Sequence, residues 1–164
     1  MALDTFVAGR YSGTYNAVDV GITDDGYTLQ QDLSVEAIDE SDAYGGTLID
    51  FIYRGGNAFL RFMSKAYKAG SISPLWPYGA LGVGATAAAP IGRLASAIAA
   101  AMVLTSTANT PAAAAPASLT GPGSILAPNF SWELLYNSKL RRVPVRLQLL
   151  PYLDTGTLRW FALT

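Results

Sequence analysis

The sequence contains no cysteine and no histidine. Without cysteine it has no disulfide framework, and the redox compartment cannot be inferred. Zinc sites built from cysteine and histidine are excluded, and so is any catalytic arrangement that uses histidine as its base. Charged residues are also scarce, at 14% of the 164 residues, against about 25% in typical soluble domains. This scarcity, together with 51% hydrophobic residues, indicates a surface covered partly by a partner.

The few charges are unevenly distributed along the chain. Residues 1–50 contain ten acidic residues and one basic residue, a net charge of −9, whereas residues 51–164 contain ten basic and two acidic residues, a net charge of +8. Folding can intermix these halves and cancel the field within one subunit. If they stay apart, copies attract one another head to tail, which generates rings or filaments.

Most of the chain has the pattern of a mainly β (α+β) domain. Alternation of apolar residues predicts a hairpin over residues 17–29 with its turn at Thr23–Gly26, because glycine after aspartate takes a positive φ at no steric cost. A short strand is predicted at Ser34–Ile38, and another at Thr47–Arg54 that ends at the following glycine pair. Further strands are predicted in these segments: "MVLTST" (102–107), "FSWELLYN" (130–137), "VPVRLQLLPYL" (143–153) and "GTLRWFALT" (156–164), the last two joined by a turn at "DTG". Alternation in the third segment places Val145, Leu147 and Leu149 on one face, with Arg146 and Gln148 on the other.

One flanking helix is predicted over Asn57–Gly70. Asn57 is a suitable N-cap, the apolar residues recur with helical spacing, and Gly70 is a suitable C-terminal stop. We therefore expect a β-sandwich or a small β-barrel with one helix beside it, in a single domain spanning residues 1–164.

Residues 94–129 contain no charged residue, and prolines at 111, 116, 122 and 128 interrupt the second half of this stretch. Proline removes a backbone donor, so neither a helix nor a central strand should continue through it. We expect residues 105–129 to form an extended Ala/Pro-rich arm that lies on another copy of the chain. Small side chains and proline lower the entropy that such docking costs. The residues assigned to this contact are Pro111, Pro116, Leu119, Ile125 and Leu126.

No arrangement of residues predicts catalysis. Asp24 and Asp25 form a pair that could suggest a metal site, but aspartate is common in turns because it hydrogen-bonds to the backbone. The acidic "DESD" at Asp39–Asp42 lacks the spacing of a calcium loop. The glycines of "YGALGVG" (78–84) do not form a phosphate-binding motif. We therefore predict a protein that is not an enzyme, with no catalytic residue, metal or cofactor.

The segment "KLRRVPVR" (139–146) is the one basic cluster. It can contact nucleic-acid phosphates, or it can pair with the acidic N-terminal third of another subunit. A pI near 5.2 argues against a dedicated nucleic-acid binder. The ion-pairing hypothesis assigns Arg141, Arg142 and Arg146 on one side and Asp39, Glu40 and Asp42 on the other.

The order of segments "VDVGITDDGYTL", "DAYGGTLIDFIYRGGNAFL", "LWPYG", "LTSTANTPAAAAPASLTGPGSILAPNF" and "LRRVPVRLQLLPY" resembles virion proteins of tailed bacteriophages, in particular tail tube proteins. The resemblance spans nearly the whole chain and depends on the general character of these segments and on their order. It implies a β-sandwich or small barrel, rings that are homohexamers, and self-assembly of rings into a hollow tube. The implied partners are other copies, other virion tail proteins, and viral DNA that passes through the lumen during ejection without sequence-specific binding.

The resemblance also implies a location in the virion tail after assembly in the host cytoplasm. Three alternatives remain: a head-to-tail joining or tail-terminator ring protein, a capsid-decorating protein, and a membrane-associated pore former. Only the weakly hydrophobic stretch Gly79–Leu104 favours the pore former, and Pro90 and Arg93 interrupt it. We therefore predict no membrane partner.

Overall fold

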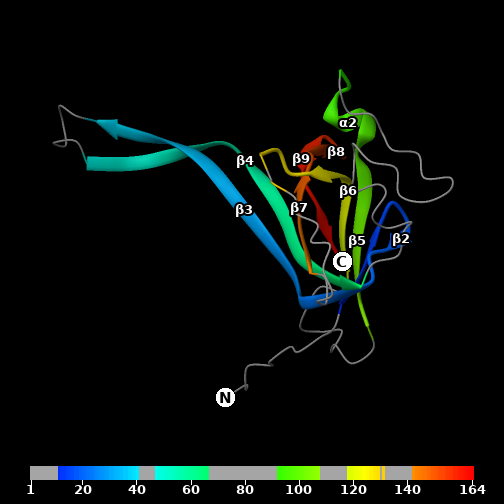
Figure 1. The fold of residues 1–164 in the computed structure, drawn as a ribbon. Coiled ribbons are helices and arrows are strands. Elements are labelled where there is room, and N and C mark those ends of the chain that lie inside the picture. Colours follow the sequence, from blue (N-terminus) through cyan, green and yellow to red (C-terminus); the bar gives the residue numbers. More distant parts are fainter. Residues whose placement is uncertain (1–10, 41–46, 67–91, 108–117, 130, 132–141) are drawn as a thin grey trace, which may run out of the picture.

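The computed structural model describes residues 11–40, 47–66, 92–107, 118–129, 131 and 142–164 (Figure 1). The described chain is mainly β, with one short helix, α2 (Ala95–Ile98), so the predicted fold class is confirmed. The strands are β1 (Tyr11–Tyr15), β2 (Val18–Asp19), β3 (Ile22–Glu40), β4 (Thr47–Ala66), β5 (Ala100–Ser106), β6 (Ser118–Leu126), β7 (Val143–Leu149), β8 (Tyr152–Asp154), β9 (Thr157–Arg159) and β10 (Ala162–Leu163).

Eight of these strands form one antiparallel sheet in the order β2-β1-β5-β6-β7-β4-β3, with β10 paired to β6. Strands β8 and β9 form a separate hairpin. Strands β3 and β1 lie near opposite ends of the strand order, yet the Tyr27 side chain of β3 lies against Gly13 of β1. This contact shows that the sheet is curled. A Cβ placed on Gly13 would come within 2.5 Å of the Tyr27 hydroxyl, so the curl requires glycine there.

The core lies on one face of this curled sheet. Its largest fully buried side chains are Leu60, Met102, Leu147 and Leu149, which come from β4, β5 and β7. Strand β7 follows the expected alternation, since Val145, Leu147 and Leu149 are buried and the residues between them are half-buried. Burial of each such aliphatic side chain stabilises the fold by about 1.5–3 kcal/mol.

The helix predicted over Asn57–Gly70 is wrong for its described residues, because Asn57–Ala66 belong to β4. Both faces of this strand are partly apolar. Leu60 and Phe62 face the core, whereas Phe59 and Met63 lie on the opposite face by register. A strand that is apolar on both faces also satisfies helical spacing, so periodicity could not separate the two.

Two predicted strand ends are also wrong. Asp25 and Gly26 have positive φ values of 59° and 74°, but they form a bulge inside β3 and not a hairpin turn. The glycine pair Gly55–Gly56 likewise lies within β4, at a second bulge where the register shifts. Aspartate and glycine supply the backbone conformation that a bulge needs as readily as the one that a turn needs.

The arm predicted at residues 105–129 is wrong in its second half. Strand β6 lies inside the sheet and pairs with β5, β7 and β10. Pro122 is exposed and lies at a bulge between the paired residues Met102–Gly121 and Ala100–Ser124. The sheet tolerates proline there because the bulge requires no backbone N–H donor at this position. Residues 108–117 lie outside the described residues.

Other expectations are confirmed. The "MVLTST" segment is strand β5 up to Ser106, and Ser34–Ile38 and Thr47–Arg54 are strand. The "DTG" turn joins β8 to β9, with positive φ at Thr155 and Gly156. The strand predicted at "FSWELLYN" falls almost entirely outside the described residues.

Candidate assembly surfaces

A two-stranded ribbon projects from the body of the molecule (Figure 1). It consists of residues 31–40 of β3 and 47–55 of β4. Residues 34–40 pair with 47–55, residues 31–33 pair with 56–58 at its base, and no residue of the ribbon pairs with any other described strand. Ten residues of extended strand reach about 30 Å. Every side chain described in the ribbon, at residues 31–38 and 50–55, is exposed. The ribbon therefore contributes nothing to the core of its own subunit.

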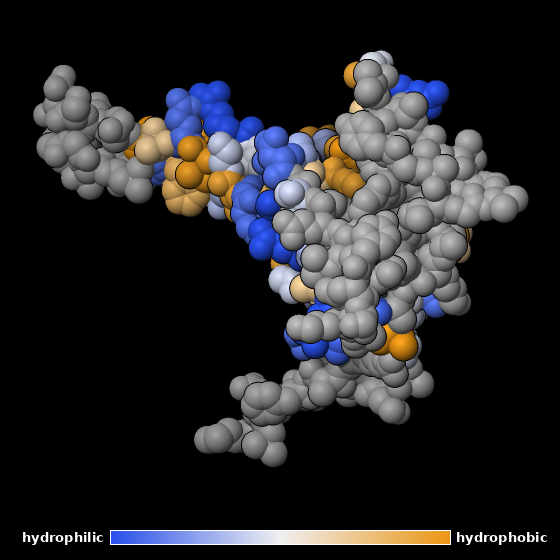
Figure 2. Space-filling view, viewed as in Figure 1, coloured by the Kyte–Doolittle hydropathy of each residue, from blue (hydrophilic) through white to orange (hydrophobic). Residues whose placement is uncertain are grey.

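Large apolar side chains lie on this exposed ribbon. Tyr53 is 63% exposed and Leu33 is 65% exposed, and the other members of the set are Val35, Ile38, Phe51 and Ile52. The space-filling view shows hydrophobic and hydrophilic atoms side by side along the ribbon (Figure 2). A projecting ribbon with this many apolar side chains is the kind of surface that a partner covers.

Ile38 and Ile52 lie on one face of the ribbon with the described acidic residues, and the larger apolar group lies on the other face. Val35 pairs with Tyr53, and Ala37 pairs with Phe51, so these four side chains share a face. The Phe51 and Tyr53 rings make an edge contact with centroids 5.4 Å apart. By strand alternation Leu33 belongs to the same face, which we call the apolar ribbon face.

The bulge at the base of the ribbon controls which side chains this face presents. The register shifts by one residue between Ser34 and Val35, so Arg54 is the additional residue on β4. Gly55 has a φ of 144°, and a Cβ on Gly56 would lie 2.4 Å from the carbonyl oxygen of Asp32. With the bulge in place, the apolar ribbon face continues the core-facing side of the sheet beyond the body.

The ribbon is acidic. Its strands contain five acidic residues and one arginine, a net charge of −4: Asp32, Glu36, Asp39, Glu40, Asp50 and Arg54. Arg54 forms an exposed ion pair with Glu36 across the ribbon. An exposed pair of this kind adds little to stability. The main property of the ribbon is its excess negative charge next to apolar side chains.

A hollow of about 440 Å³ lies on the face of the sheet opposite the core, lined by two arginines and two aspartates. We call it the basic hollow because Lys65 and Arg142 at its border add positive charge. It is lined by residues of β3, β4 and β7, among them Arg61, Met63, Pro144 and Arg146. Arg61 and Arg146 occupy directly paired positions on neighbouring strands. Like charges in paired positions destabilise a sheet unless an anion screens them.

Arg146 is held in a fixed position in this hollow. Its guanidinium carbon lies 4.0 Å from the centre of the Phe59 ring, a cation–π contact. Its Nε is buried and has no hydrogen-bond partner among the residues that the structure describes. Arg61 is exposed and makes no ion pair within the described part of the chain. The described residues therefore supply no ion-pair partner to Arg61 and no acceptor to Arg146 Nε.

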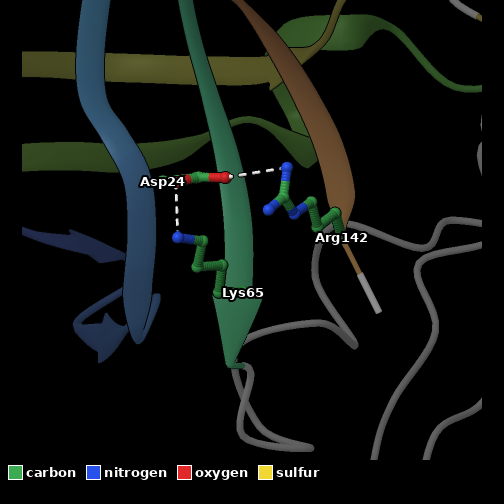
Figure 3. A network of polar contacts seen from close by, with 3 residues as sticks. All are labelled: Asp24, Lys65 and Arg142. Atoms are coloured by element: carbon green, nitrogen blue, oxygen red, sulfur yellow. Dashed lines mark ion pairs between the residues drawn. The ribbon is translucent and has the colours of Figure 1, made fainter. Parts of the chain in front are cut away.

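An ion cluster borders the hollow (Figure 3). The Asp24 carboxylate forms ion pairs with Lys65 Nζ at 2.5 Å and with Arg142 Nη1 at 3.3 Å. Strand β3, strand β4 and the residue before β7 therefore meet at one carboxylate. The hydrogen bond from Lys65, with the positive charges of Lys65 and Arg142, holds the pKa of Asp24 below its ordinary value. The stability that this adds is present above pH 4 and is lost as the pH falls through the lowered pKa.

The residues predicted from sequence to make assembly contacts lie in different parts of the structure. Leu119 is buried in the subunit's own core, so its assignment to an assembly contact is wrong, and Leu126 packs against that core. Ile125 is half-buried opposite Gln148. Arg142 pairs with Asp24, and Arg146 lies in the basic hollow. Asp39 and Glu40 are at the outer end of β3, whereas Pro111, Pro116, Asp42 and Arg141 lie outside the described residues.

The apolar ribbon face and Arg61 were not predicted from the sequence. The alternation of Leu33 with Val35 and of Phe51 with Tyr53 was visible, but alternation predicts a strand and does not say whether its apolar side is covered. Arg61 was not assigned to a site because a helix was predicted over the segment that contains it.

The described residues contain neither a metal-binding cluster nor a membrane-spanning helix. No cluster of three or more acidic residues suited to a metal ion was found there. Among the same residues, no helix is long and apolar enough to cross a membrane. No protein-family model and no curated protein matches the sequence.

Proposed function

We propose that this chain is a structural, non-enzymatic subunit that assembles with copies of itself, and that the assembly is the tail tube of a tailed phage virion. The observation that carries self-assembly is the projecting ribbon with its apolar face. A ribbon that buries nothing in its own subunit gains hydrophobic stabilisation only from a partner. The phage tail tube is the assembly that the order of sequence segments indicates.

The proposed assembly is a stack of rings, most simply hexamers, around a lumen that conducts DNA without reading its sequence. A ribbon that reaches about 30 Å from the body is long enough to contact a neighbouring subunit or the next ring. The antiparallel sheet of the body supplies a rigid scaffold from which such a ribbon can project.

The first experiment is negative-stain electron microscopy of the purified protein over a range of concentrations. Hollow tubes with a regular axial repeat are the expected result. Single closed rings would contradict the tube and indicate a joining or terminating ring protein. A monomer at every concentration would contradict self-assembly.

The apolar ribbon face is tested by the triple variant Val35→Ser, Phe51→Ser, Tyr53→Ser. We expect a folded protein with unchanged circular dichroism that no longer assembles, because each removed side chain is exposed in the subunit. The matched control replaces three exposed leucines away from the ribbon, Leu94, Leu153 and Leu158, by serine. If the triple variant assembles as the wild type does, the ribbon face is not an interface.

A further inference from the structure

We propose that the basic hollow around Arg61 and Arg146 is the receptor for the acidic ribbon of a second copy of this chain. This inference rests on the proposed self-assembly and names the two surfaces that meet. The shared chemistry is a carboxylate against a pair of guanidinium groups, surrounded by apolar contacts.

The first argument is the unsatisfied state of the hollow. Arg61 and Arg146 stand in paired positions, and the buried Arg146 Nε has no acceptor among the described residues. A carboxylate that binds between the two arginines would offset the repulsion between them. The stacking of Arg146 on Phe59 means that little side-chain entropy is lost when the anion arrives.

The second argument is charge complementarity. Lys65, Arg142, Arg61 and Arg146 lie in or beside the hollow, against Asp24 and Asp25, a local net charge of +2. Asp24 is already engaged by Lys65 and Arg142, so the two arginines remain for a partner. The ribbon brings a net charge of −4, with the described acidic side chains Asp32, Glu36 and Asp50 exposed along it.

The third argument is that the contact has to be intermolecular. Strands β3 and β4 run without interruption from the hollow into the ribbon, so the ribbon points away from the hollow of its own subunit. Asp50 and Arg61 are eleven residues apart on the same strand, roughly 35 Å of extended chain. Only the ribbon of another copy can bring the outer acidic residues, such as Glu36 and Asp50, to the two arginines.

The apolar parts of the two surfaces also match. The hollow is lined by Met63, Pro144 and Val145 as well as by the arginines. On the ribbon, Ile38 and Ile52 lie on the same face as Glu36 and Asp50. A contact with apolar side chains and a few convergent charges is the usual composition of a specific protein interface.

The test is the variant Arg61→Glu with Arg146→Gln, with Arg93→Glu as a matched control because Arg93 is an exposed arginine outside the hollow. Sedimentation over a concentration series gives the concentration at which assembly begins. We expect that concentration to rise by about tenfold or more in the hollow variant and to stay unchanged in the control. Arg61→Glu alone, which alters only an exposed side chain, covers the case in which the double variant does not fold.

The ribbon side is tested by neutralising Asp32→Asn, Glu36→Gln and Asp50→Asn together, which should raise the assembly concentration by a similar factor. Both effects should shrink at about 1 M salt, where screening acts over about 3 Å. Normal assembly of both hollow variants, while removal of the apolar ribbon face abolishes it, would overturn the receptor and leave self-assembly standing. A wild type that never assembles would overturn both.

Phosphate is the competing anion. Binding of a short DNA duplex is therefore measured for the wild type and for Arg61→Glu at the same salt concentration. If Arg61→Glu loses DNA binding but assembles normally, the hollow takes nucleic-acid phosphate and the proposal is wrong. If assembly weakens and DNA binding is unaffected, the carboxylate receptor is supported.

Discussion

At the scale of single residues, the sheet holds two tyrosines in apolar surroundings. The Tyr15 hydroxyl donates a hydrogen bond to the carbonyl oxygen of Ser124 at 3.0 Å, and Tyr15 is 2% exposed. Tyr27 packs on Phe62 with ring centroids 5.2 Å apart, and its hydroxyl reaches Gly13 of β1. These two side chains join distant parts of the curled sheet across the core.

These tyrosines predict a loss of stability in alkali. Burial raises the pKa of Tyr15 to about 12, and burial together with the charge of Asp19 raises the pKa of Tyr27 to about 12. A raised pKa means that the folded state favours the neutral phenol, so the stabilisation is complete below about pH 10 and is lost as the pH rises towards 12. For Tyr15 the loss amounts to about 2–3 kcal/mol.

Denaturant unfolding between pH 8 and pH 12 measures this loss. Tyr15→Phe should cost about 1 kcal/mol at neutral pH, because the Ser124 carbonyl loses its donor. The same variant should lose less stability than the wild type between pH 10 and 12. Tyr53→Phe is the control, since Tyr53 is exposed on the ribbon. An alkaline loss that is equal in Tyr15→Phe and in the wild type would show that Tyr15 is not its source.

At the scale of elements, the long β3–β4 hairpin has two parts with different roles. Its inner part supplies Ala58, Leu60 and Phe62 to the core, whereas its outer part is the exposed ribbon. The body should therefore fold without the ribbon. Replacing residues 34–55 by Asn-Gly, a favourable hairpin turn, would join Leu33 directly to its partner Gly56.

We expect this ribbonless variant to unfold cooperatively at nearly the temperature of the wild-type monomer, because every side chain that the structure describes in the deleted segment is exposed. Removing residues 118–122 of β6 is the contrasting change. It deletes Leu119 and Gly121 from the centre of the sheet and should abolish cooperative unfolding. A ribbonless variant that fails to fold would mean that the ribbon supports the body.

The elements also show how far the sequence could predict the fold. Alternation in β7 identified its buried face correctly, because one side of that strand is apolar and the other is not. The same reasoning failed for β4, where residues 58–63 are apolar on both faces. Asp25–Gly26, Gly55–Gly56 and Pro122 were interpreted as ends of elements, but the sheet accommodates each of them as a bulge. Local chemistry specifies the backbone conformation, and tertiary pairing decides its use.

The candidate site was less predictable than the fold. Acidic and basic halves were visible in the sequence, and the structure places part of the acidic half on the ribbon and Arg61 and Arg146 in a hollow. The pairing of these two arginines depends on the register of β4 against β7, which no local pattern encodes. The assembly contact was predicted in the proline-rich segment and not in the ribbon, because the composition of that segment is more unusual than that of two alternating strands.

At the scale of the whole molecule, a ribbon and a receptor at different places on one chain define a head-to-tail contact. Such a contact leaves one free ribbon and one free hollow in every dimer, so growth continues until a ring closes or a filament forms. A symmetric contact would stop at two copies. The wild type is therefore expected to pass beyond a dimer as its concentration rises.

Mixing two defective variants tests this polarity. The ribbonless variant keeps the hollow, and the Arg61→Glu, Arg146→Gln variant keeps the ribbon, so neither should associate with itself. Together they share one intact contact, and we expect a 1:1 complex that grows no further, measured by light scattering on a sizing column. The complex should weaken with added salt, since its charged pairs are partly exposed. Self-association of the ribbonless variant would show that another surface drives assembly. If the mixture stays monomeric while the wild type assembles, the ribbon and the hollow do not meet.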